Sequence, residues 1–231
     1  MKTIGILLAC CGCLLAQNDG RVVGKPYSAT EVTHSQQTLS NGSHIDRTIT
    51  TLVWQDDQGR VRTQPGDVQR VMIQDWVAKV AYMLDLQQKT VRKSEMKGPA
   101  VQRIAGDVSP VEEARAAEQA TAATRAGTAR VIEDLGTQCI NGVSALGVRV
   151  TTTIPVGAIG NDQELKSVTE RWYSNDIHAM VRTVTKDVRS GVNTFELTNI
   201  VRAAPDPALF QVPAGFTAVD IEARPVSKPE E

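Results

Sequence analysis

The chain has 231 residues, of which 41% are hydrophobic and 22% are charged, and its formal net charge is -1. These values fit a single globular domain with one hydrophobic core. Nucleic acids and anionic membrane surfaces recruit proteins through clustered Lys and Arg, so the balanced charge argues against both as partners.

Residues 1–16 have the pattern of a secretory signal peptide. A cation at Lys2 precedes an apolar run, and a polar stretch opens at Gln17. The run is shorter than the roughly 20 residues that a transmembrane helix needs. We therefore expect cleavage before Gln17, a periplasmic or secreted protein, and no transmembrane anchor in the mature chain. The alternative is a lipoprotein acylated at Cys10, because the Leu-Leu-Ala that precedes this cysteine resembles a lipobox.

Cleavage before Gln17 would leave Cys139 as the only one of the four cysteines in the mature chain. An intramolecular disulfide is then excluded. The apolar neighbours of Cys139 predict a half-buried side chain in a strand.

The rest of the chain is predicted to be one domain over residues 27–223, built from antiparallel strands. Short alternating segments rich in Val, Ile and Thr are separated by turn residues. The Asn41-Gly42 pair favours a type I′ hairpin turn between the first two strands. Residues 70–85 form one apolar stretch, which we interpret as a strand. The predicted strands cover residues 27–39, 44–55, 60–64, 70–85, 88–93, 143–154, 164–174, 177–187 and 192–201.

Residues 98–130 differ from the rest of the domain. They are poor in large apolar residues and rich in Ala, Glu, Thr and Arg, so they can form helix but are expected to bury little. Ser109 followed by Pro110 predicts a helix start. We expect an exposed helix or a mobile insertion, with a lid over a ligand surface as the functional alternative. We also expect a folded domain after deletion of residues 99–130. Residues 17–26 and 224–231 are predicted to be flexible ends.

No catalytic or metal-binding motif stands out. The three histidines lack the short spacing of metal sites, and the chain has no Gly-x-Ser-x-Gly elbow, Gly-rich phosphate loop or Cys-x-x-Cys pair. The acidic pairs Asp56-Asp57 and Glu112-Glu113 are adjacent in sequence, so their side chains point apart and are predicted to be solvated. The sequence therefore predicts a protein that is not an enzyme and has no cofactor or metal.

The C-terminal stretch PDPALFQVPAGF, residues 205–216, predicts a helical turn at 208–210 and then an extended piece that covers an open sheet edge. Its pattern of Leu-Phe, one residue, Val-Pro, one residue and Gly-Phe resembles the ending of secreted bacterial proteins of uncharacterised function. Some of these are related in shape to the LolA/LolB lipoprotein carriers and to the N-terminal half of the stress regulator RseB. Residues 170–181 and 187–200 also resemble a group of exported acidobacterial proteins.

The resemblance covers roughly residues 27–94 and 134–219, and it implies an α+β fold that is mainly antiparallel β. The implied sheet is curled into an unclosed half-barrel, with one or more helices on its concave face. In the carriers that face is a hydrophobic cavity for acyl chains. This chain has only three each of Phe, Trp and Tyr, and it lacks an obvious set of inward-facing aromatic residues.

Turn chemistry predicts which side chains of the last three strands share a face. A hairpin tip at Asn175-Asp176 would place Trp172 opposite Ala179, and a loop over residues 187–191 would place Val181 opposite Leu197. The row predicted for the concave face, as the lining of a ligand site or as ordinary core, comprises Val168, Trp172, Val181, Phe195 and Leu197.

Two functions are consistent with this sequence. The first is a periplasmic binding module for an apolar ligand, such as an acyl chain or a lipoprotein tail, which needs a continuous apolar lining. The alternative is a ligand-free interaction or stress-sensor domain that contacts an envelope protein.

Overall fold

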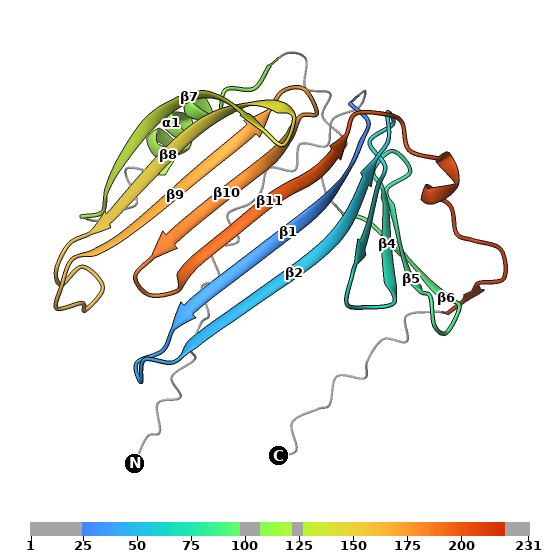
Figure 1. Ribbon diagram of the computed structural model, residues 1–231, viewed down its shortest axis with the longest axis horizontal. Helices are drawn as coiled ribbons and strands as arrows, with labels where there is room; N and C mark the ends of the chain where they lie inside the picture. The colour runs from blue at the N-terminus through green and yellow to red at the C-terminus, as the bar shows by residue number, and fades with distance from the viewer. Residues whose placement is uncertain (1–24, 98–106, 122–126, 220–231) are drawn as a thin grey trace.

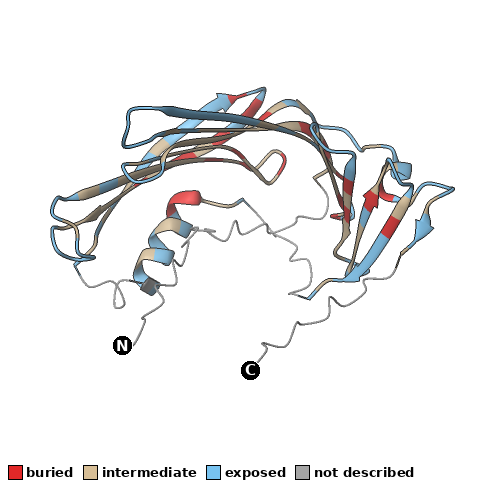
Figure 2. Cartoon of the chain, turned by 90° about the horizontal axis from the view of Figure 1, so that it is seen from below, coloured by how far each residue is buried: buried red, intermediate tan, exposed pale blue. Residues whose placement is uncertain are grey.

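Twelve strands form one continuous sheet in the order β12-β6-β5-β4-β3-β2-β1-β11-β10-β9-β8-β7. The structure, a computed structural model, describes residues 25–97, 107–121 and 127–219 (Figure 1). Neighbouring strands are antiparallel, apart from the parallel pair β12 and β6. The sheet curls into an arch that does not close, and a helix lies on its inner side (Figure 2). This is the mainly antiparallel, unclosed α+β fold that the sequence predicted.

The element boundaries follow the alternating segments of the sequence. The first half contains β1 (Tyr27–Thr38), β2 (His44–Gln55), β3 (Val61–Pro65), β4 (Arg70–Asp75), β5 (Val80–Asp85) and β6 (Thr90–Glu95). The second half contains α1 (Pro110–Thr121), β7 (Ala129–Ile140), β8 (Val143–Ile154), β9 (Leu165–Ser174), β10 (Ala179–Asp187), β11 (Gly191–Val201), the 3₁₀ helix η2 (Pro207–Phe210) and β12 (Thr217–Ala218). No helix within the described ranges has the length and apolar character to cross a membrane. The predicted signal peptide over residues 1–16, with Cys10, and the predicted tail 224–231 lie outside the described residues.

Strand pairing assigns each side chain to one face of the sheet, because directly paired residues point to the same side. We call the face on which α1 lies the concave face and the other the convex face (Figure 2). On the concave face, Val111 of α1 is buried against Val148 and Val150 of β8. These two valines therefore mark the concave side of the sheet.

Helix α1 begins where the sequence predicted. The Ser109 hydroxyl accepts a hydrogen bond from the Glu112 backbone N–H at 3.3 Å, and Pro110 is the first helical residue. Val111 in the first turn is 7% exposed, whereas most of the described α1 residues are exposed or half-buried, so the helix buries little beyond this turn, as expected.

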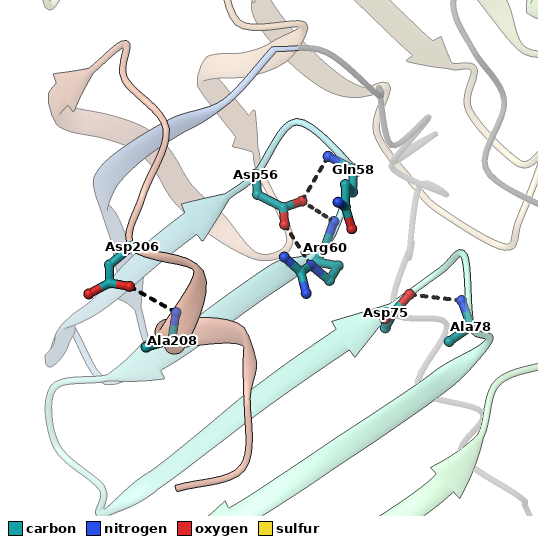
Figure 3. A network of polar contacts seen from close by, with 7 residues as sticks. All are labelled: Asp56, Gln58, Arg60, Asp75, Ala78, Asp206 and Ala208. Carbon is teal, nitrogen blue, oxygen red and sulfur yellow. Dashed lines mark hydrogen bonds and ion pairs between the residues drawn. The ribbon is translucent and has the colours of Figure 1, made fainter.

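The C-terminal segment covers the convex face at the other end of the sheet. Phe210 of η2 is buried in a cluster with Val71 of β4 and Leu84 of β5. Asp206 caps η2 by accepting a hydrogen bond from the Ala208 backbone N–H at 2.9 Å (Figure 3). Strand β12 then pairs with β6. The prediction that this ending covers an open sheet edge is confirmed, and the covered edge is that of β6.

The turn between β2 and β3 depends on a buried carboxylate. Asp56 accepts hydrogen bonds from the backbone N–H of Gln58 at 3.0 Å, from the backbone N–H of Arg60 at 2.8 Å and from the Arg60 Nε at 2.6 Å (Figure 3). Asp56 is 4% exposed, so the prediction that it is a solvated charge is wrong. Three N–H donors replace the water that the carboxylate loses on folding.

Residues 70–85 form two strands and not one. Strand β4 ends at Asp75, whose side chain accepts a hydrogen bond from the Ala78 backbone N–H at 2.8 Å (Figure 3). Lys79 completes the turn with a φ of 53°. Gly and Asn commonly adopt a positive φ and so mark turns in a sequence, whereas Lys rarely does. The sequence therefore gave no indication of the turn at Lys79.

The two Asn-Gly pairs of the chain form different turns. In the loop over residues 39–43 only Gly42 has a positive φ, so the predicted type I′ turn is wrong there. Asn141 and Gly142 both have positive φ, at 49° and 85°, and they join β7 directly to β8. Cys139 beside this turn lies in a strand as predicted, but it is exposed and not half-buried.

Candidate functional site

In the part of the chain that the structure describes, α1 and the C-terminal segment do not cover the concave face of the central strands. Helix α1 packs on β7, β8 and β9, whereas the C-terminal segment packs on the convex face of β4 and β5, so the inner side of β10, β11, β1 and β2 is left uncovered by either (Figure 2). We call this region the central concave face. Two rows of paired residues cross it, and each starts at a valine beneath α1. The first row runs Val148, Arg171, Thr183, Phe195, Thr33, Ile49, and the second runs Val150, Thr169, Thr185, Asn193, Ser35, Arg47.

Beyond the two valines, these rows are mainly polar. Only Phe195 and Ile49 are apolar, and every member is half-buried apart from Arg47, which is exposed. The hydroxyls of Thr169 and Thr185 lie 3.3 Å apart, which is the contact expected of cross-strand partners on one face. The two rows are therefore mainly polar. Farther along the same strands the concave side becomes apolar, because Ala29, Val53 and Leu197 are buried in one cluster, against which Phe195 packs.

The predicted register of β9 and β10 is wrong. Ala179 pairs with Ser174, because the loop between these strands has four residues and not two. A bulge at Val181 then makes Arg182, and not Val181, the partner of Trp172. The longer loop shifts the pairing by two residues, and an even shift leaves each side chain on its predicted face of the sheet. The bulge then adds one residue, so the β9 residues beyond it lie on the face opposite to the predicted one. The register of β10 and β11 is confirmed in part, since Thr183 pairs with Phe195 as predicted.

The five residues predicted as one row consequently divide between the two faces. Phe195 and Leu197 pair with Thr33 and Glu31 of β1 and lie on the concave side. Val168 and Trp172 fall on the convex side, because Trp172 pairs with Arg182, which pairs with Glu196. Val181 sits at the bulge and is fully buried. Only Phe195 and Leu197 keep the position predicted for a ligand-lining residue, and that role stays a prediction.

Trp172 belongs to the core. It is 9% exposed and shares a buried cluster with Ile140 and Val143 near the tip of the β7–β8 hairpin. Its ring lies over Gly147, the residue opposite it on β8, so closely that a Cβ atom there would come within 2.5 Å of the ring. The interpretation of Trp172 as ordinary core packing is the one that these contacts favour.

Arg171 and Tyr173 bring polar chemistry to the α1 side of the central concave face. Burial, together with the charge of Arg130, lowers the pKa of Arg171, and Glu113 of α1 partly offsets this. Burial and the charge of Glu113 raise the pKa of Tyr173 to about 12, so the phenol is neutral at physiological pH. Sequence analysis missed both residues. Their alternation with Trp172 was visible, but which of the alternate positions face α1 depends on the pairing of β8 with β9.

A second polar feature lies on the arm formed by β4, β5 and β6. A shallow depression of about 260 Å³ is lined by Arg70, Met83, Leu84, Asp85, Gln88, Thr90 and Arg92. Arg70 and Asp85 are directly paired across β4 and β5. The depression is too small to hold more than a small polar group.

The histidines have local partners. The His34 Nε2 lies 2.7 Å from an Asp46 oxygen, and the His44 Nδ1 lies 3.1 Å from the Thr38 hydroxyl. Among the residues that the structure describes, no group of three or more His, Cys, Asp and Glu side chains could hold a metal ion.

Comparison with known proteins finds likeness of shape only. No family model matches the chain, and no curated protein matches it. Among solved structures, an uncharacterized conserved protein from Thermus thermophilus is 10% identical, with a TM-score of 0.45 over 86% of this chain and 91% of its own. MucB in the Pseudomonas aeruginosa MucA/MucB complex is 15% identical, with a TM-score of 0.48 over 88% of this chain and 60% of its own, so this chain spans less than two thirds of MucB. A LolA superfamily protein from Nitrosomonas europaea is 9% identical, with a TM-score of 0.31 over 86% of this chain and 95% of its own.

Proposed function

We propose that the protein is a binding module of the bacterial envelope that takes up an extended segment of a partner protein on its central concave face. The observation that carries this proposal is the polar composition of the two rows that cross the face. Its place in the envelope rests on the signal-like pattern of residues 1–16.

The row chemistry favours a polypeptide over an acyl chain. Threonine hydroxyls and the Asn193 amide can donate to and accept from the backbone of an extended segment. A lipid tail on the same face would desolvate these groups without replacing their hydrogen bonds, which costs about 1–3 kcal/mol for each group. Along the row Thr33 pairs between Phe195 and Ile49, so these two side chains do not form a continuous apolar lining, and Leu197 beside Phe195 is already buried in the core. We therefore favour the interaction domain over the carrier, and we assign no catalytic residue.

Site-specific photo-crosslinking in the native host tests this proposal with a matched pair of positions. Thr183 and Val184 are adjacent in β10, but Thr183 pairs with Phe195 on the concave face, whereas Val184 pairs with Thr194 on the convex face. A photo-reactive phenylalanine analogue at Thr183 should form an adduct with one recurring polypeptide, and the same analogue at Val184 should not. The purified partner should then bind the wild-type protein in solution and fail to bind a Thr183→Lys variant.

Lipid adducts at Thr183, or co-purified lipid in native mass spectrometry of the protein from its own host, would overturn the proposal in favour of the apolar-ligand carrier. Equal crosslinking at Thr183 and Val184 would also contradict it, because the partner would then not select the concave face.

A further inference from the structure

We propose that Arg171 is an anion-binding residue that pairs with the carboxylate of an acidic side chain in the bound segment, beside Tyr173 and at the edge of the central concave face next to α1. This inference rests on the proposed function for the origin of the carboxylate. The anion site itself depends only on the residues around Arg171.

Three arginines of β7, β8 and β9 differ in how their charge is balanced. Arg130 pairs with Glu118 of α1 at 3.1 Å. Arg149, on the convex face, pairs with Glu170 at 2.8 Å, and this hydrogen bond raises its pKa. Within the described ranges, by contrast, no hydrogen bond or ion pair holds the Arg171 guanidinium.

The position of Arg171 makes this lack of a partner costly. Its neighbours across the strands are Val148 of β8, which is buried under α1, and Thr183 of β10, which has a neutral side chain. A half-buried guanidinium has lost part of its hydration, and its five N–H donors are arranged to bind a carboxylate through two parallel hydrogen bonds. Hydrogen bonds from the guanidinium to an incoming carboxylate would replace the hydration that Arg171 loses on burial.

Two groups shape the anion that Arg171 could accept. The Tyr173 phenol is two residues along the same strand, so its side chain points to the same face and can donate a further hydrogen bond to an oxyanion. Glu113 lies near both residues and is exposed, so it competes weakly with an incoming anion. The site is thus a guanidinium and a phenol with one loosely placed internal competitor.

The site can be tested without knowledge of the partner. The purified protein, labelled with ¹⁵N-arginine, is titrated with N-acetylglutamate, with its neutral isostere N-acetylglutamine and with inorganic phosphate, and the arginine Nε–H resonances are followed by NMR. The Arg171 resonance is identified by its loss in Arg171→Lys. N-acetylglutamate should shift it saturably, and N-acetylglutamine should not.

Three variants test whether each charged residue strengthens or weakens the binding of N-acetylglutamate. Arg171→Gln should weaken N-acetylglutamate binding about tenfold or more, the effect of losing one charge-assisted interaction. Glu113→Gln should strengthen binding, since it removes the competitor. Lys186→Gln is the matched control, because it removes one exposed positive charge from the convex side of β10 and should leave binding unchanged.

Equal shifts with N-acetylglutamate and N-acetylglutamine, or weaker binding in Glu113→Gln, would overturn the anion site. Tighter saturation by inorganic phosphate than by N-acetylglutamate would replace the carboxylate by a phosphate and so contradict the proposal as stated. If the carboxylate binds at Arg171 but photo-crosslinking at Thr183 finds no polypeptide, the proposed function fails while the anion site stands.

Discussion

Gly147 and Trp172 form a matched pair across β8 and β9. The indole ring occupies the space that any side chain at position 147 would need. Because Trp172 is buried among apolar residues, Trp172→Ala should lower the free energy of unfolding by about 3–5 kcal/mol. Gly147→Ala should also destabilise the protein, because it displaces the ring.

Urea unfolding of both single variants and the double variant measures this coupling. The double variant should be less destabilised than the sum of the two single variants, since the alanine at position 147 no longer meets a ring. Additive effects would show that the ring does not rest on Gly147.

His178 links stability to pH. Burial lowers the pKa of His178 from 6.5, and the charge of Lys25 adds to this against the opposite effect of Asp107. The unfolded chain therefore takes up a proton at a higher pH than the folded protein, and this part of the stability is present above about pH 6.5 and is lost as the pH falls through the folded pKa. His178 has a φ of 49°, and asparagine tolerates such a conformation without a titrating ring.

His178→Asn should therefore lose less stability than the wild type between about pH 7.5 and about pH 5.5. Urea unfolding at the two pH values provides the measurement, and the difference between variant and wild type removes the contributions of other groups. An identical loss in both proteins would mean that His178 titrates alike in the folded and unfolded states.

At the scale of elements, α1 and the C-terminal segment differ in how they are attached. Strand β6 lies near one edge of the sheet and β7 forms the other edge. The expectation that residues 99–130 can be deleted without loss of the fold stays a prediction. The deletion would remove the connection itself as well as the first residues of β7.

Replacing α1, residues 110–121, by a Gly/Ser linker of the same length keeps the covalent link between β6 and β7 but removes the helix that packs on the sheet. We expect cooperative unfolding to persist, with a free energy of unfolding lower by about 1.5–3 kcal/mol from the lost burial of one valine side chain. Val111→Ala in the intact helix is the control, and it should account for much of this loss. Loss of cooperative unfolding in the linker variant would mean that α1 is needed for the sheet to form.

At the scale of the whole molecule, the two covers are placed on opposite faces and at opposite ends of the arch. Each of the two terminal regions of the sheet has its own buried cluster, and a third cluster joins the central strands. Among the described residues, neither cover therefore lies on the inner side of the central strands. A protein that binds a partner segment there can do so without unfolding any described element.

Export is the property of the whole molecule that can be tested first. We expect the exported protein to begin at Gln17, because the apolar run ends there and polarity returns abruptly. N-terminal sequencing of protein from its own host provides the measurement. A chain that begins at an acylated Cys10 would contradict soluble export and would place the protein on a membrane surface.

Local signals in the sequence determined most strands, most turns and the helix start, but they did not predict β7 and they joined β4 and β5 into one strand. Alternation of apolar and polar residues depends on neighbours two positions apart, and the cap at Ser109 depends on residues within one turn, so both can be predicted from short segments. The C-terminal motif likewise predicted its own covering role. Prediction from short segments was wrong at Lys79, because Lys is not a residue type that usually forms turns.

Only the tertiary structure decided which side chains share a face and which charges are balanced. One extra residue in the bulge at Val181 moved Trp172 to the side opposite Phe195, and no local pattern predicts such a bulge. Asp56 and Arg171 are both charged residues beside apolar ones, yet the first is satisfied by three N–H donors and the second is half-buried beside neutral neighbours. The difference arises because register and burial depend on contacts between strands that are distant in sequence, and these contacts exist only once the sheet has formed.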